Sequence, residues 1–228
     1  MAGRRPLTSR EQRKLLRVVR RLSPRDRSLL TTQWMTGLRV SEVLSLTVTA
    51  VWREGKWLPR IGVAPRQLKG GYGRTRYIPI LPELRRALER QLNWLDRTFG
   101  LKPDLPLFPS RQHPGGVIRS ITRVQAHTIV KTAFARAGIV DDGRLGCHSL
   151  RKTWARTVYR SAGNDLVVLK AALGHADVAV TQAYLDVGED AVAAAISRCD
   201  FTRGPRIRRF PVALPAPAPI PAPLSTAA

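Results

Sequence analysis

The sequence predicts an α+β fold that is mainly α-helical and carries one small three-stranded antiparallel sheet. Two patterns support this prediction. Over most of the chain, apolar residues recur three and four positions apart, which is the spacing of one face of a helix. Between residues 47 and 80 the pattern changes to alternating and β-branched runs broken by glycines, which is typical of antiparallel hairpins.

Three helices are expected before the sheet. The stretch "LTSREQRKLLRVVRRL" opens with a capping-box pattern and continues with apolar residues at helical spacing. A Ser-Pro pair then starts a second helix, and Gly37 suits the left-handed residue that ends it. The third helix lies in "LRVSEVLSL", where Ser41 is the expected N-cap. Arg39 is therefore placed just before the start of a helix.

The sheet is expected to contain two turns, and helices return after it. Glu54-Gly55 marks the first turn, and the glycines near residue 71 mark the second, beside Lys69. "NDLVVLKAALG" is predicted to be a helix that runs from an Asn164 cap to a Gly174 stop. The other expected helices are "LPELRRALERQLNWLDRTFG", "VQAHTIVKTAFARAG", "SLRKTWARTVYRSAG", "DVAVTQAYLDV" and "GEDAVAAAISRC".

The charge of the chain indicates a polyanionic partner. Its 39 Lys and Arg against 16 Asp and Glu give a formal net charge of +23, and nucleic acid is the first expectation for such an excess. A membrane surface is the rival polyanion, but the apolar stretches are short and the basic start has no apolar region behind it. We therefore expect a non-secreted, cytoplasmic protein without a membrane partner. Cys147 and Cys199 have no spacing that indicates a disulfide framework or a zinc site.

The composition changes near residue 203. A basic run, "RGPRIRRF", is followed by a Pro/Ala-rich stretch that cannot bury enough apolar surface to fold. We expect one domain over residues 1–202 and a disordered tail over residues 203–228.

Several polar residues stand where helices are expected to begin. His148 and Arg151 are three positions apart and so share one face at a helix start, where backbone N–H groups favour an anion. Arg39 occupies a similar place. His175 follows a helix stop, and Tyr184 lies on an apolar stripe nine residues later. Taken alone, His175, Tyr184 and Arg39 are better explained by packing or surface roles, whereas His148 with Arg151 fits a surface role and an anion site equally.

As a set, these residues resemble the tyrosine recombinase (phage integrase) family over roughly residues 8 to 200. The matching segments are "TGLRVSEVLSL", "KGGYGRTRYIPI", "HSLRKTWA" and "LGHADVAVTQAYLD". The resemblance implies the catalytic-domain fold of that family and a catalytic set made of Arg39, Lys69, His148, Arg151, His175 and Tyr184.

The resemblance also implies a mechanism of DNA cleavage and rejoining. Tyr184 would attack a DNA phosphodiester and form a 3′-phosphotyrosyl link. Arg39 and Arg151 would stabilise the charge of the transition state, and Glu42 could orient Arg39. His148 would act as general base or proton relay, and Lys69 would protonate the leaving 5′-oxygen. His175 would hydrogen-bond the phosphate.

The implied partner is double-stranded DNA, bound by a homotetramer on synapsed sites, with accessory DNA-bending proteins possible. No metal or other cofactor is expected, and the protein would act at the nucleoid. "GEDAVAAAISRC" resembles the family's C-terminal helix, which docks on a neighbouring protomer, although an ordinary intramolecular helix fits the pattern equally.

The sequence leaves some alternatives open. No separate N-terminal core-binding domain is expected, which puts sequence-specific grip in doubt, and Arg74 could take the general-acid position in place of Lys69. Relaxation of DNA by a type IB topoisomerase and noncatalytic DNA binding through a helix-turn-helix are the competing functions.

Overall fold

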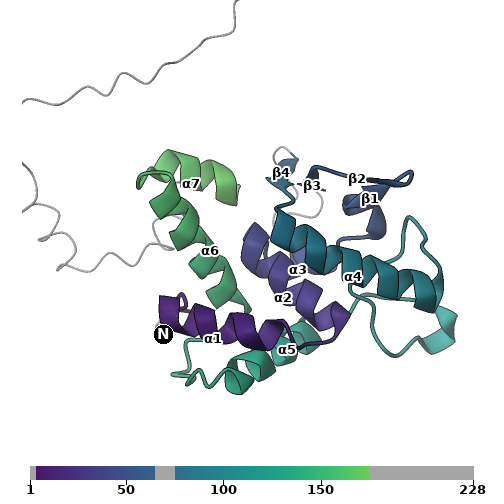
Figure 1. Cartoon of the computed structure of the whole chain (residues 1–228), viewed down its shortest axis with the longest axis horizontal. Coiled ribbons are helices and arrows are strands. Elements are labelled where there is room, and N and C mark those ends of the chain that lie inside the picture. Colours follow the sequence, from purple (N-terminus) through teal and green to yellow (C-terminus); the bar gives the residue numbers. More distant parts are fainter. Residues whose placement is uncertain (1–3, 65–74, 175–228) are drawn as a thin grey trace, which may run out of the picture. The chain divides into compact units, whose positions relative to one another are not determined.

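The first helices begin and end where local capping predicts. The computed structural model describes residues 4–64 and 75–174, all within the first of two compact units, Met1–Asp186 (Figure 1). Helix α1, Ser9–Val19, is capped by Thr8 in a complete capping box, and α2, Pro24–Thr36, is capped by Ser23. Gly37 ends α2 in the left-handed conformation, with φ of 62°, as the sequence predicts.

Helix α3, Val40–Leu44, begins earlier than expected. Its N-cap is Arg39 and not Ser41. The difference arises because the carboxylate of Glu42, in the first turn, reaches back and accepts the backbone N–H of Arg39, which fixes the helix start at Arg39 without a capping hydroxyl.

The strands form two antiparallel ladders in place of the one three-stranded sheet that the sequence predicts. A 3₁₀ turn, η1 (Val48–Ala50), precedes β1 (Trp52–Arg53), which pairs with β2 (Lys56–Trp57) across the expected Glu54-Gly55 turn. Strand β3 (Arg60–Val63) pairs with β4 (Arg76–Pro79). Residues 56–63 thus pair with one strand at their start and with another at their end. The break falls at Pro59, which has no N–H to donate.

The later helices also follow the sequence closely. They are α4 (Pro82–Phe99), the 3₁₀ turn η3 (Pro114–Gly116), α5 (Arg123–Arg136), α6 (Cys147–Ser161) and α7 (Leu166–Leu173). Gly174 ends α7 as predicted, but the N-cap is Asp165 and not Asn164. The Asp165 carboxylate accepts two backbone N–H groups of the first turn, while Asn164 adopts a positive φ outside the helix.

Helix α2 lies at the centre of the helical packing. It contacts α4 on one side and α6 on another, while α1 packs along α5 (Figure 1). The main core includes Leu29, Leu30, Leu88, Phe108 and Phe134, all almost fully buried. A smaller cluster joins α6 to α7 through Ala155, Leu169 and Leu173, and it fixes the end of α7 against α6. The predicted fold class, mainly α-helical with a minor antiparallel sheet component, is confirmed; the strands differ in forming two two-stranded ladders and not one three-stranded sheet.

In the described ranges, no helix has both the length and the apolar character needed to cross a membrane.

Candidate active site

Arg39 and Glu42 form an ion pair at the start of α3. Nη1 of Arg39 donates to Oε1 of Glu42 at 2.8 Å, and the backbone N–H of Arg39 donates to Oε2 at 2.7 Å. The Glu42 side chain is fully buried, whereas that of Arg39 is 22% exposed. This is the contact expected of an acid shortly after Arg39: the buried carboxylate holds a guanidinium that still reaches the surface.

Arg76 is a second partner of Glu42, and it was not expected from the sequence. Its Nη2 donates to Oε2 of Glu42 at 3.0 Å, and its Nη1 donates to the carbonyl of Leu173. Arg76 is only 8% exposed. One signal could have revealed it: the alternation of "TRYIPI" puts Arg76 on the same face as the buried Ile78, so an arginine stands at an inward position of the strand.

Arg151 lies at the centre of this cluster and is almost completely buried, with 1% exposure. It projects from the first turns of α6. Its Nη1 donates to the carbonyl of Gly37, and its Nη2 donates to the carbonyl of Leu173 at 3.3 Å. Arg151 therefore ties the turn before Arg39 to the end of α7, and Arg76 and Arg151 converge on one carbonyl.

The charges of the cluster keep Glu42 ionised. Burial by itself would raise the pKa of Glu42, but Arg76, the two contacts from Arg39 and the charge of Arg151 outweigh it and lower the pKa below its ordinary value. For Arg76 the effect of burial is the larger one: it lowers the pKa of the guanidinium, although the negative charge of Glu42 acts in the opposite direction. A carboxylate shared by two guanidinium groups at low exposure is a charged, hydrogen-bonded network and not a set of surface ion pairs.

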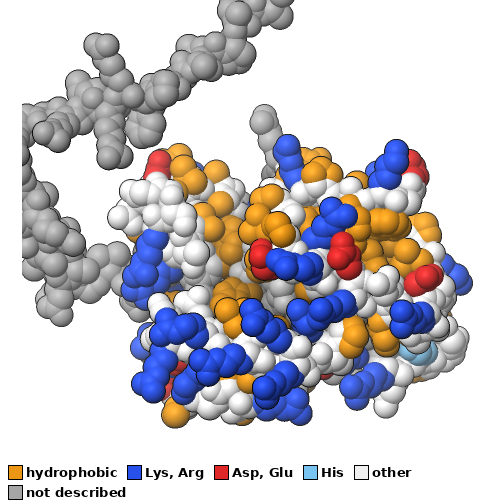
Figure 2. Space-filling view, viewed as in Figure 1, with side chains coloured by type: hydrophobic (Ala, Val, Ile, Leu, Met, Phe, Trp, Pro, Cys, Tyr) orange, Lys and Arg blue, Asp and Glu red, His pale blue; other side chains and the backbone are white. Residues whose placement is uncertain are grey.

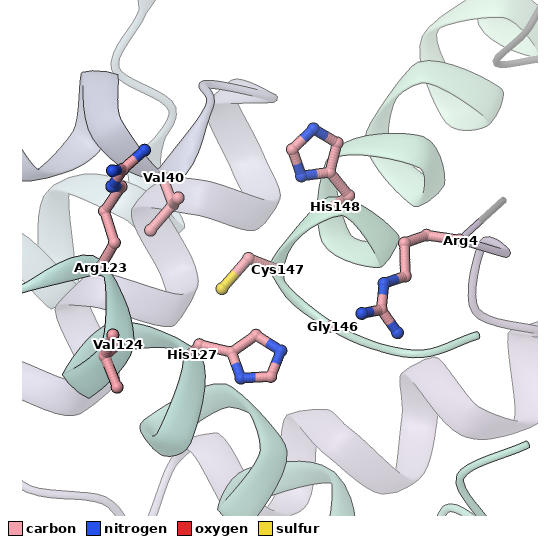
Figure 3. Close-up of a pocket in the computed structure, with 8 residues that line it drawn as sticks. All are labelled: Arg4, Val40, Arg123, Val124, His127, Gly146, Cys147 and His148. Atoms are coloured by element: carbon pink, nitrogen blue, oxygen red, sulfur yellow. The ribbon is translucent and has the colours of Figure 1, made fainter. Parts of the chain in front are cut away.

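His148 lies at the N-terminus of α6 on the wall of an open pocket of about 450 Å³. Figure 3 shows Arg4 and Arg123 on opposite sides of this pocket, with His127, Cys147 and His148 between them. His127, from α5, faces the same pocket as His148. Partial desolvation, followed by the positive charges of Arg151 and Arg39, lowers the pKa of His148, so the imidazole is neutral near pH 7.

The structure places three of the six predicted catalytic residues in one region. Arg39, His148 and Arg151 meet where α3, the start of α6 and the end of α7 come together. Lys69, His175 and Tyr184 lie outside the described residues, as does Arg74. His175 follows directly in sequence on Gly174, whose neighbour Leu173 accepts from both buried arginines.

Basic side chains dominate the surface. Figure 2 shows Lys and Arg spread across one face of the molecule, with acidic side chains fewer in number. On α1, for example, Arg10, Arg13 and Arg17 are all exposed. A surface of this kind attracts phosphate groups without regard to base sequence.

Within the described part of the chain, no group of three or more His, Cys, Asp or Glu side chains is placed to hold a metal ion. Most of the positive charges that act on His148 are guanidinium groups, which suit a phosphate oxygen in geometry and charge.

The sequence matches the phage integrase family over residues 5–190. The tyrosine recombinase XerC of Erythrobacter litoralis (strain HTCC2594) is 36% identical over 162 residues, which cover 70% of this chain and 45% of that protein. The chain thus spans about half the length of the curated relatives it matches.

Solved structures agree on the fold. The crystal structure of XerA recombinase matches with a TM-score of 0.68 at 23% identity, over 88% of this chain and 68% of that one. The XerH site-specific recombinase, solved bound to its difH substrate before cleavage, matches with a TM-score of 0.63 at 22% identity, over 85% of this chain and 54% of that one. The helices and small sheets described above are arranged as in these catalytic domains.

Proposed function

Because the chain belongs to the phage integrase family, we propose that it is a tyrosine site-specific recombinase, which cuts and rejoins DNA through a covalent 3′-phosphotyrosine intermediate. The observation that supports this most strongly is the buried network in which Glu42 holds Arg39 while Arg151 ties the neighbouring turns together. Burying charged side chains costs desolvation free energy, which the ion pairs and hydrogen bonds of this network offset. Two guanidinium groups beside a neutral imidazole suit phosphoryl transfer.

In the proposed reaction, the phenolic oxygen of Tyr184 attacks the scissile phosphorus, and the bond from phosphorus to the 5′-oxygen breaks. The phenolic proton passes to His148, whose lowered pKa leaves the imidazole neutral and able to accept it. Lys69 donates a proton to the leaving 5′-oxygen. One phosphoester is exchanged for another, so the reverse attack by a 5′-hydroxyl reseals the strand without ATP.

Arg39 and Arg151 stabilise the extra negative charge of the pentavalent transition state, and His175 donates a hydrogen bond to the phosphate. Fixed positive groups in a site of low dielectric do this without reorganising at the moment of reaction. In this mechanism the arginines do what a metal ion does in other phosphoryl-transfer enzymes, so no cofactor is required.

The proposed partner is double-stranded DNA, since XerH is bound to its difH substrate in the solved complex and this chain carries a net charge of +23. Recombination between two sites needs two pairs of strand cuts, which a homotetramer on synapsed DNA supplies, with DNA-bending proteins as possible accessories. The enzyme would act in the cytoplasm at the nucleoid. Residues 1–202 would form the catalytic domain and residues 203–228 a basic, Pro/Ala-rich tail.

The test is cleavage of a nicked suicide duplex in EDTA, with a covalent protein–DNA band on a denaturing gel as the readout. The duplexes are drawn from a library of random-centre sites selected for binding by this protein. We expect a band with the wild type and with Tyr77→Phe, which removes an exposed hydroxyl from the described sheet, and none with Tyr184→Phe.

A selected duplex that is bound but never cleaved would refute the recombinase and favour noncatalytic DNA binding. Relaxation of supercoiled DNA without exchange between two sites would favour the topoisomerase activity. The relatives named above are recombinases by name, which favours strand exchange.

A further inference from the structure

Arg76 is a buried arginine to which the proposed mechanism gives no role. It lies on β4 with its guanidinium directed between two acceptors from distant parts of the chain, Oε2 of Glu42 on α3 and the carbonyl of Leu173 at the end of α7. These partners are 34 and 97 residues away in sequence. Burying an arginine is costly unless its donors are hydrogen-bonded, and here both Nη groups are bonded while Nε has no hydrogen-bond partner among the described residues. The two Nη contacts, to acceptors on separate elements, point to a positional role.

The contact with Glu42 links Arg76 to Arg39. One carboxylate oxygen, Oε1, accepts from Nη1 of Arg39, and the other, Oε2, accepts from Arg76 and from the backbone N–H of Arg39. With both oxygens bonded, the carboxylate plane is fixed. If Arg76 is removed, the carboxylate keeps its two contacts with Arg39 but loses its one anchor on β4, so Glu42 and Arg39 can shift together and the guanidinium of Arg39 is directed less firmly.

The contact with Leu173 links Arg76 to Arg151. Both guanidinium groups donate to this carbonyl, and the next residue, Gly174, has φ of +67°. A Cβ at Gly174 would lie 3.2 Å from Cδ and 3.4 Å from Nη1 of Arg76, so the side chain packs closely under the turn. Arg76 therefore contacts the last residues before His175 as well as the carboxylate that holds Arg39.

A lysine could not make both contacts equally well. The guanidinium is planar and presents its two Nη groups in fixed directions, which fits two acceptors on opposite elements, whereas an ammonium is a single point of charge on a flexible stem. The choice of arginine at this inward strand position thus matches its surroundings.

We propose that Arg76 is a positioning residue of the active site: it fixes the Glu42 carboxylate that orients Arg39, and it fixes the end of α7. The proposal rests on the proposed recombinase function. It predicts that Arg76 affects the chemical step more than it affects DNA binding, because it acts on the direction of a transition-state contact.

The experiment compares Arg76→Gln and Arg76→Lys with Arg60→Gln, which removes an exposed arginine from the partner strand of the same ladder. Single-turnover cleavage of the suicide duplex, DNA affinity and thermal melting are measured for each protein, with cleavage assayed well below every melting temperature. Misplacing a reacting group by about 1 Å costs about 100-fold in rate. We expect a loss of about 10- to 100-fold for Arg76→Gln, a smaller loss for Arg76→Lys, no loss for Arg60→Gln, and DNA affinities within about threefold throughout.

A second substrate separates positioning from general damage. A methylphosphonate at the scissile position carries one negative charge fewer, so it depends less on Arg39 in the transition state. We expect the Arg76→Gln defect to shrink on this substrate, in parallel with the defect of Arg39→Ala.

Equal fold-losses on both substrates, or a wild-type rate for Arg76→Gln, would overturn the positioning role. Failure of the proposed function gives a different result, because the wild type itself would then form no covalent band on the phosphodiester.

Discussion

Gly37 is the position where a single methyl group should do the most damage to the site. The residue has φ of +62°, and a Cβ there would lie 2.7 Å from Cζ3 of Trp154 on α6 and closer still to two other ring atoms. The Gly37 carbonyl also accepts from Nη1 of Arg151. A Gly37→Ala substitution therefore strains the backbone, drives the indole away and disturbs the turn that leads to Arg39.

The magnitude follows from these three effects. An L-residue in the left-handed region costs about 1 to 2 kcal/mol. Overpacking costs about 1 to 3 kcal/mol, and the lower end applies here because Trp154 borders an open groove into which the ring can partly move. Loosening a hydrogen bond to a charged group costs about 1.5 to 3 kcal/mol. Since these effects overlap, we expect a total loss of about 3 to 5 kcal/mol in the free energy of unfolding.

Urea unfolding of the purified protein measures this loss, with Gly138→Ala as the matched control. Gly138 has φ of +59°, but a Cβ added there would meet no atom within 4 Å, so the control isolates the backbone cost of about 1 to 2 kcal/mol. In a Trp154→Ala background, Gly37→Ala should cost little more than the control. If Gly37→Ala and Gly138→Ala destabilise the protein equally, the proposed clash and the loss at Arg151 are both refuted.

Three further predictions follow from the network and the helix caps. Glu42→Gln should cost about 3 kcal/mol or more at pH 7, because it leaves buried arginines unpaired. The folded-state pKa of Glu42 is lowered, so its contribution to the free energy of unfolding is present above the unfolded pKa of about 4.3 and is lost as the pH falls below that value. Urea titrations below that pH should therefore show a smaller loss of stability on acidification for Glu42→Gln than for the wild type. Because the pKa of His148 is lowered, the acid-side inflection in the pH profile of kcat/KM for DNA cleavage should lie below the ordinary histidine pKa of about 6.5. An inflection above about 6.5 would contradict a neutral base. Thr8→Ala should cost about 1 kcal/mol through loss of the α1 cap, and thermal melting should show almost no change for Thr128→Ala, an exposed mid-helix control.

Much of the site's surroundings could be predicted because the relevant forces act over a few residues. The caps at Thr8 and Ser23 and the left-handed stops at Gly37 and Gly174 depend on side chains within one helical turn, and all four were predicted correctly. The two helix starts that were wrong, at Arg39 and Asp165, differ only slightly from the expected positions. At α3 the Glu42 carboxylate accepts the backbone N–H of Arg39, and at α7 the Asp165 carboxylate caps the first turn in place of Asn164.

Helical periodicity and the Glu54-Gly55 turn depend on neighbouring residues, and the excess of positive charge is a sum over the chain, so the amino-acid sequence by itself determined them. The burial of particular arginines depended instead on long-range packing. Arg76 and Arg151 meet at Leu173 from positions 97 and 22 residues away, and Arg151 reaches the Gly37 carbonyl across 114 residues. No spacing rule connects such distant positions, because their contact is set by how α2, α6 and α7 pack beside the β3–β4 ladder.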